Sequence, residues 1–394
     1  MSGLGLLRGR VAALGLVIIA LLATGITVAA THAAAPSSRD SASAAPGHAA
    51  GEPPAAVAAA TLRVTSVTPA AGSKRVNGAA PIQVTFSAPL AASSRLPRVV
   101  PAIAGRWHRV SADSVEFAPA AGFGQHTLVR VRIPAGRHGM RSENGGLLAA
   151  PQTVSFRTGA YSPKRLAQLL AQLRYLPLTW TPASAAAAAG TSVAAERSAA
   201  FAPPSGTFSW KHGYPAQLHA FWQHAGSHSL IIKGAVMAFE ADHSLALDGI
   251  AGPQVWNALF TAAAAGDSNK NGYTYGIASQ HLPESLTIWH NGRKVLHTLA
   301  NTGIPGRITN VGTFPVYLRY LNQIMRGTNP DGTKYADPVK YVSYFNGSDA
   351  VHYFPRASYG FPQSLGCVEI QLDPAKTAWS YLTYGSLVTV TPPK

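Results

Sequence analysis

Apolar and polar residues alternate in short runs along the part of the chain between residues 61 and 159. A period of two is the pattern of a strand that places one face on a core. Turn sequences rich in Pro, Gly and Asn separate the runs, so the pattern predicts an all-β sandwich over residues 61–159. The runs are Ile82-Val84-Phe86, Val115-Phe117, Val129-Val131-Ile133 and Val154-Phe156.

A helical period replaces this alternation at Ser162. Ser162 before Pro163 is a typical helix start, and the leucines that follow recur on one helical face. Residues 160–266 are therefore predicted to form a small α-helical domain, in which the Ala-, Ser- and Pro-rich stretch 182–204 is an internal linker or a long loop. The apolar helix positions are Leu166, Leu169, Leu170, Leu173, Val236, Phe239, Val255, Trp256 and Leu259.

Strand patterns return at Tyr273 and continue to the end of the chain. They predict a β-rich domain with few helices over residues 273–394. The positions that indicate strands are Leu286, Ile288, Val295, Leu296, Phe314, Val316, Val342, Tyr344, Leu387, Val388 and Val390.

The N-terminal sequence has the composition of a membrane-targeting segment. Arg8 and Arg10 precede an apolar run, 11–30, that has no ionisable side chain. Residues 1–34 are predicted to be a signal peptide or a retained membrane anchor, and residues 35–60, rich in Ala, Pro and Ser, a flexible tether. Both alternatives place the rest of the chain outside the cytoplasm, at the extracytoplasmic face of the membrane or in the cell wall.

The net charge and the cysteine content limit which partners and which cysteine chemistry are expected of this chain. The net charge is +16, with 32 Lys and Arg against 16 Asp and Glu, but the basic residues are scattered. This distribution favours anionic wall polymers as partners over nucleic acid. Cys367 is the single cysteine of the sequence, so it forms no internal disulfide and is either an inert buried side chain or a reactive group.

The neighbourhood of Cys367 fits a nucleophile. Gly366 permits a tight turn that leaves amides free for a substrate oxygen, and His352 lies 367 − 352 = 15 residues upstream. That length allows an antiparallel return of the chain that brings imidazole and thiol together. Because the chain has 14 histidines, the residues alone leave open both a catalytic pair and a chance one.

Two stretches resemble accessory domains of bacterial surface proteins. The stretch VTSVTPAAGSKRVNGAAPIQVTFSAPL, from Val64 to Leu90, resembles bacterial Ig-like domains. The stretch KGAVMAFEADHSLALDGIAGPQVWNALFTAAAAG, from Lys233 to Gly266, resembles a peptidoglycan-binding domain. In the second stretch, packing of the bundle remains the simpler role for each apolar residue.

The C-terminal region resembles a YkuD-type L,D-transpeptidase catalytic domain. The matching stretches are Ser364-Leu365-Gly366-Cys367-Val368, ITNVGTFPV and YVSYFNGSDAVHYF, within a resemblance from Leu286 to Val390. The resemblance implies that Cys367 is the nucleophile, that His352 is the general base, and that Ser364 and Gly366 shape the pocket, with the amides of Gly366 and Cys367 as oxyanion donors. It implies no metal or organic cofactor.

The resemblance also implies a reaction. The thiolate attacks a peptidoglycan stem tetrapeptide, D-alanine leaves, and the acyl group passes to an amine of a neighbouring stem, which cross-links the wall. An L,D-carboxypeptidase that uses water instead and a catalytically dead wall-binding scaffold are the alternatives. The whole chain is accordingly expected to combine an Ig-like sandwich, a helical peptidoglycan-binding bundle and a β-rich catalytic domain.

Two positions depart from the family pattern. Leu365 stands where the family usually has His, and Glu369 where it usually has Arg or Asn. Glu369 either alters donor specificity or is an ordinary strand residue, solvated or paired with Arg356. Arg356, whose fork-shaped guanidinium suits a substrate carboxylate, is either the first candidate for substrate binding or an ordinary surface arginine on a loop, and Tyr353 and Tyr359 are the other candidates.

Overall fold

The computed structural model describes residues 60–184, 192–222 and 229–393. The targeting segment predicted at residues 1–34 lies outside these residues, as does the tether predicted at 35–60 except for Ala60. Within the described part of the chain, no helix is both long enough and apolar enough to cross a membrane.

The alternating runs near the N-terminus form the predicted strands of a sandwich. A sheet of order β1-β2-β5-β4 and a sheet of order β3-β6-β7 are both antiparallel, and their inward side chains share one hydrophobic core. The strands are β1 Val64–Thr68, β2 Ile82–Phe86, β3 Arg98–Val100, β4 Gly105–Ser111, β5 Ser114–Pro119, β6 Leu128–Ile133 and β7 Gln152–Arg157.

The helical period after Ser162 also forms as predicted. Helix α1 begins at Pro163, directly after Ser162, and its leucines are buried. The Ser229 side chain caps α4 by accepting a hydrogen bond from the Ile232 amide. The elements of this region are α1 Pro163–Gln172, β8 Leu178–Pro182, α2 Val193–Phe201, β9 Gly206–Trp210, α3 Ala216–His219, the 3-10 helix η2 Ala220–Trp222, α4 Leu230–Asp242 and α5 Pro253–Ala265.

The prediction that residues 182–204 form a linker or a long loop is wrong for the second half of this stretch. Residues Val193–Phe201 form helix α2, and its Glu196 is buried in an ion pair with Arg165 of α1. Alanine-rich composition resembles a tether, but alanine is also the best helix former. The burial of one carboxylate against α1 selects the helix, and this contact has no local signal in the sequence.

The helices do not form a bundle with a core of their own. Their buried side chains pack with Leu178 and Trp180 of the β8–β9 hairpin and with Tyr275 and Leu387 of the C-terminal region in one cluster. Helix α4 approaches the C-terminal region so closely that a Cβ built on Gly234 would lie 2.5 Å from the Gly385 carbonyl oxygen. The helical region thus shares its core with the domain that follows it.

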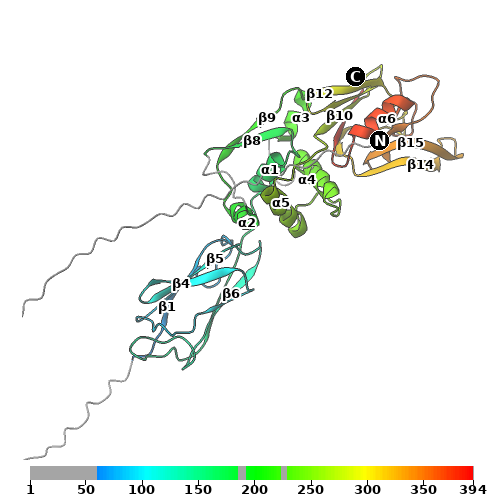
Figure 1. The fold of residues 1–394 in the computed structure, drawn as a ribbon. Coiled ribbons are helices and arrows are strands. Elements are labelled where there is room, and N and C mark those ends of the chain that lie inside the picture. Colours follow the sequence, from blue (N-terminus) through cyan, green and yellow to red (C-terminus); the bar gives the residue numbers. More distant parts are fainter. Residues whose placement is uncertain (1–59, 185–191, 223–228, 394) are drawn as a thin grey trace, which may run out of the picture. The chain divides into compact units, whose positions relative to one another are not determined.

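The C-terminal region contains two sheets and one helix. One sheet has the order β12-β11-β10-β18-β13 and the other β14-β15-β16-β17, and helix α6 packs on β15 and β16. Figure 1 shows α6 beside β15. Residues from both sheets and α6 share a core. The elements are β10 Thr274–Ser279, β11 Ser285–His290, β12 Arg293–Leu299, β13 Gly312–Pro315, β14 Leu318–Thr328, β15 Lys334–Asn346, β16 Asp349–Tyr353, β17 Val368–Ile370, α6 Leu372–Tyr381 and β18 Leu387–Thr391.

We expect Glu196→Ala to lower the free energy of unfolding of the helical region by about 3 kcal/mol, because removing one member of a buried ion pair leaves the other charge unpaired. Arg165 and Glu196 have side chains that are 0% and 1% exposed. Thermal denaturation followed by circular dichroism of the full chain measures the change.

The matched control is Asp267→Ala, which removes an exposed acid just beyond α5 and should change stability by less than about 0.5 kcal/mol. Equal melting of the two variants would contradict a structural role for the pair. The double replacement Arg165→Met with Glu196→Leu should recover most of the loss, because it removes both charges together.

Candidate active site

Cys367 lies at the end of a tight turn that leads into β17. The Ser364 hydroxyl donates to the Cys367 carbonyl oxygen at 2.6 Å and accepts from the Gly366 amide at 3.2 Å. Gly366 has φ +122°, and a Cβ there would meet the Asp349 carboxylate at 2.9 Å. Glycine is therefore required before the cysteine, since other residues are strained in this conformation.

The chain connects His352 to Cys367 by a different route from the one predicted. Strands β16 and β17 are parallel, with Val351 opposite Val368 and His352 opposite Glu369. The expected antiparallel return is wrong. The segment 354–367 carries the chain back to the end at which β16 begins, so β17 runs beside β16 in the same direction. Cys367 is the residue directly before β17.

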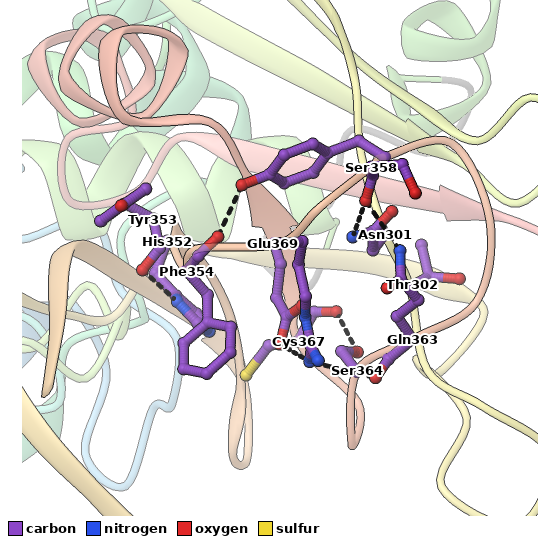
Figure 2. Close-up of polar contacts among 12 residues, drawn as sticks. Asn301, Thr302, His352, Tyr353, Phe354, Ser358, Gln363, Ser364, Cys367 and Glu369 are labelled. Carbon is purple, nitrogen blue, oxygen red and sulfur yellow. Dashed lines mark hydrogen bonds and ion pairs between the residues drawn. The ribbon is translucent and has the colours of Figure 1, made fainter. Parts of the chain in front are cut away.

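The His352 imidazole is held neutral and in one orientation. Its side chain is buried at 2% exposure, and its Nδ1 lies 3.0 Å from the Tyr353 carbonyl oxygen, the contact drawn in Figure 2. Burial lowers the pKa of His352, while the Tyr353 carbonyl and the charge of Glu369 act in the opposite direction. A neutral imidazole that donates through Nδ1 leaves Nε2 as a proton acceptor.

The Cys367 thiol is in its protonated form. Burial raises its pKa to about 12, and the nearby carboxylates of Glu369 and Asp349 raise it further, against the effect of the Ala350 amide. The sulfur lies 3.5 Å from the Ser348 carbonyl oxygen. Among the described residues no hydrogen bond joins this thiol to the imidazole of His352, so the resting site is a neutral pair.

One cavity of about 680 Å³ contains both groups, a volume in the range of small-molecule sites. Its walls come from the β14–β15 hairpin, from strand β16 and from the loop that precedes β17. The lining residues are Ile304, Gln323, Ile324, Met325, Arg326, Asn329, Pro330, Asp331, Tyr335, Asp337, Val339, Tyr344, Ser348, His352, Phe354, Arg356, Gln363, Leu365, Cys367 and Glu369.

Arg356 is already paired. Its Nε and Nη2 donate to the two oxygens of Glu369 at 2.7 and 2.9 Å, and Nη2 also donates to the Gln363 carbonyl. The guanidinium lies 4.7 Å from the centroid of the Phe354 ring. Of the two roles left open for Glu369, the structure shows the pairing with Arg356, and the fork that was expected to face a substrate carboxylate is occupied by this partner.

The two tyrosines predicted to bind substrate are not among the residues that line the cavity. Tyr353 packs against the core that the two sheets share. The Tyr359 hydroxyl donates to the Phe354 carbonyl oxygen at 2.6 Å, a hydrogen bond within the segment 354–367. Sequence reasoning instead missed Tyr335 and Tyr344 of β15, whose only signal was their place on an alternating strand.

No group of three or more His, Cys, Asp or Glu side chains in the described ranges is placed to hold a metal ion. The cavity contains a thiol and an imidazole, which are groups that can act chemically as a nucleophile and a base.

Comparison with known proteins identifies two domains. Residues 58–158 match the family model of the bacterial Ig-like domain, and residues 277–390 match that of the L,D-transpeptidase catalytic domain. Neither match includes the helices α1 to α5, so the predicted peptidoglycan-binding domain has no support from this comparison. No curated protein matches the chain.

Solved structures of similar proteins carry the same family name. An L,D-transpeptidase from Mycobacterium smegmatis is 15% identical over 84% of this chain and 100% of its own, with a TM-score of 0.28. L,D-transpeptidase 3 from Mycobacterium tuberculosis is 17% identical over 84% of this chain and 98% of its own, with a TM-score of 0.28. The catalytic domain of an Enterococcus faecium L,D-transpeptidase is 25% identical over 30% of this chain and 96% of its own, with a TM-score of 0.28. On the family matches, this chain carries an L,D-transpeptidase catalytic domain behind a bacterial Ig-like domain.

Proposed function

We propose that the chain is an exported L,D-transpeptidase that uses Cys367 as a nucleophile and His352 as a general base to cross-link peptidoglycan stems. The observation that carries the proposal is that both side chains line one cavity, where burial lowers the pKa of the imidazole and its Nδ1 is fixed by the Tyr353 carbonyl. Within the described ranges no hydrogen bond engages its Nε2. The family match supports peptidoglycan as the substrate, which is an extracytoplasmic polymer.

The acylation step follows from this geometry. The thiol proton passes to His352 Nε2 while sulfur attacks the carbonyl carbon of the third stem residue, forming a C–S bond. The C–N bond to D-alanine then breaks, and the proton on His352 goes to the departing amine. Proton transfer within the substrate complex is needed because the resting thiol is protonated.

The second step returns the enzyme to its resting state. The amine of a neighbouring stem attacks the thioester carbon, a C–N bond forms and the C–S bond breaks. The amine proton passes by way of His352 to the leaving sulfur. The same acyl-enzyme gives a carboxypeptidase if water replaces the amine.

The two amides proposed from the sequence as oxyanion donors, those of Gly366 and Cys367, differ in their hydrogen bonds. The Gly366 amide is engaged by the Ser364 hydroxyl, so the Cys367 amide is the better candidate to stabilise the oxyanion. Ser364, fully buried, positions the turn through its two hydrogen bonds. Leu365 lines the cavity as an apolar wall.

The pair of Arg356 and Glu369 supports a positioning role for both residues. It spans from the loop after β16 to β17, the strand that follows the nucleophile, and Glu369 is only 5% exposed. A bidentate, partly buried pair fixes geometry better than an exposed one. We therefore place Arg356 in the support of the loop rather than in contact with a substrate carboxylate.

The helical region supports the same site mechanically. Its core includes Tyr275 of β10 and Leu387 of β18, adjacent strands in the first sheet of the catalytic domain. We propose that α1, α4 and α5 stabilise that sheet, and that any contact of these helices with the glycan is secondary.

A carbapenem should acylate the soluble chain, residues 61–394, and add its mass once. Cys367→Ala should abolish the adduct, and His352→Ala should slow its formation by about a hundredfold or more, because the base that accepts the thiol proton is lost. Intact-protein mass spectrometry over time measures both. An unmodified wild-type chain would favour the scaffold alternative and make Leu365 the first suspect.

Product analysis of the same preparations separates transfer from hydrolysis. Incubation with disaccharide-tetrapeptide should release D-alanine and yield a cross-linked dimer when an acceptor amine is present. Release of D-alanine with tripeptide as the sole other product, at any acceptor concentration, would identify a carboxypeptidase.

Alkylation of Cys367 by iodoacetamide should accelerate about tenfold per pH unit from pH 7 to 10. The raised pKa of the thiol, about 12, keeps it protonated over this range, and only the thiolate reacts. Mass spectrometry of samples quenched over time gives the rates, and free cysteine, with a pKa of about 8.5, is the control that should level off within the range. Levelling of the protein's rate below pH 9 would contradict the neutral resting pair.

Glu369→Gln should slow carbapenem acylation by about tenfold, because Arg356 loses its ionic partner and the loop loses a fixed contact. Burial lowers the pKa of His352 and the charge of Glu369 opposes this, so the variant should lower that pKa further and move the acidic limb of the acylation-pH profile to lower pH. The exposed Asp373→Asn is the control. A slower rate with an unmoved profile would indicate a merely structural effect.

A further inference from the structure

The acidic side chains that line the active-site cavity differ in what they bind. Glu369 is paired with Arg356, and Asp331, at the tip of the β14–β15 hairpin, accepts hydrogen bonds from the amide and hydroxyl of Thr333. Asp337 of β15 is the third acid of the cavity wall. Within residues 60–184, 192–222 and 229–393, it has neither a hydrogen bond nor an ion pair to its carboxylate.

The strand directs Asp337 into the cavity. Successive side chains of a strand point to opposite faces, and Tyr335, Asp337 and Val339 are three alternate residues that all line the cavity. The residues between them, Ala336 and Pro338, are exposed and belong to the other face. Asp337 is therefore one of a row of inward-facing side chains, less exposed than its neighbours along the strand.

The carboxylate of Asp337 interacts electrostatically with two other side chains that line the cavity, His352 and Tyr335. Burial lowers the pKa of His352, and the carboxylate of Asp337 is among the groups that oppose this shift. Burial raises the pKa of Tyr335, and Asp337 raises it further. A carboxylate that has no hydrogen bond or ion pair among the described residues, and that faces the cavity containing Cys367, is suited to a cationic group on the substrate.

We propose that Asp337 binds the side-chain ammonium of the third residue of the donor stem, and so selects stems in which this amine is free. The inference rests on the proposed function, which places the carbonyl of that residue at Cys367. The third residue is a diamino acid, whose side chain ends in an ammonium several bonds from the reacting carbonyl. With the carbonyl at the thiol, the side chain extends along the cavity wall.

The selection has a chemical consequence. A stem whose third-residue amine is already acylated, as in a cross-link, has lost the positive charge and has a neutral amide instead. Such a stem leaves Asp337 buried by substrate without a partner, which costs binding. The site would thus favour donors that have not yet served as acceptors.

A pair of synthetic donors tests the proposal on the soluble chain. One is L-Ala-γ-D-Glu-L-Lys-D-Ala and the other is the same tetrapeptide with the lysine Nε acetylated. We expect wild type to prefer the free amine by about tenfold in kcat/KM for D-alanine release, mostly through KM. Asp337→Asn should reduce the preference to less than about twofold, and Asp337→Glu should retain part of it.

Two comparisons make the result specific. Asp331→Asn, an acid of the same cavity with its own hydrogen bonds, should keep the wild-type preference. The acetylated donor should react with Asp337→Asn at least as fast as with wild type, because the variant removes the carboxylate that this donor leaves unpaired. An undiminished preference in Asp337→Asn, or an equal loss for both donors, would overturn the proposal.

A binding measurement separates this inference from the proposed reaction. In Cys367→Ala, which has no nucleophile, calorimetric affinity for the free-amine donor should exceed that for the acetylated donor, and adding Asp337→Asn should remove the difference. A difference that is present here without turnover by wild type would refute the proposed reaction alone. Equal affinities for the two donors would refute the role of Asp337 even if wild type releases D-alanine.

Discussion

The parallel pairing of β16 with β17 is the constraint on which the site depends. It places His352 opposite Glu369 and leaves Cys367 one residue before the paired strand. Because the connection between two parallel strands must return to the starting end of the first, the segment 354–367 has to fold back across the sheet. The pair of Arg356 and Glu369 and the hydrogen bond from Tyr359 to the Phe354 carbonyl hold this segment. The tight turn of Ser364, Gly366 and Cys367 is its last part.

The electrostatics of the cavity follow from burial. Burial lowers the pKa of His352 and raises that of Cys367, so the two side chains are neutral together in the resting site. The proposed proton transfer, from the Cys367 thiol to the His352 imidazole, starts from this neutral state. The carboxylate of Glu369 is paired with Arg356, whereas the carboxylate of Asp337, at the cavity wall, has no hydrogen bond or ion pair within the part of the chain that the structure describes. This difference is the basis of the proposed donor selectivity.

The helical region gains its stability from contacts that cross domain boundaries in the sequence. Its core includes a hairpin, β8–β9, and residues of the catalytic sheet such as Tyr275 and Leu387. Arg165 and Glu196 form a buried pair that joins α1 to α2. A segment with this packing supports the catalytic sheet directly, and its removal would expose the apolar surface of β10 and β18.

The sequence alone determined the elements whose periodicity is strong and local. The alternating runs predicted β2, β5, β6 and β7, the leucine spacing after Ser162 predicted α1, and the resemblance around Cys367 predicted the family of the catalytic domain. Only the tertiary structure decided the parallel direction of β17, the helix in 193–201, the partner of Arg356 and the place of Asp337 in the cavity that also contains Cys367 and His352. Each of these depends on contacts between residues far apart in the chain, whose energies come from burial and pairing, and local patterns of hydrophobicity do not encode them.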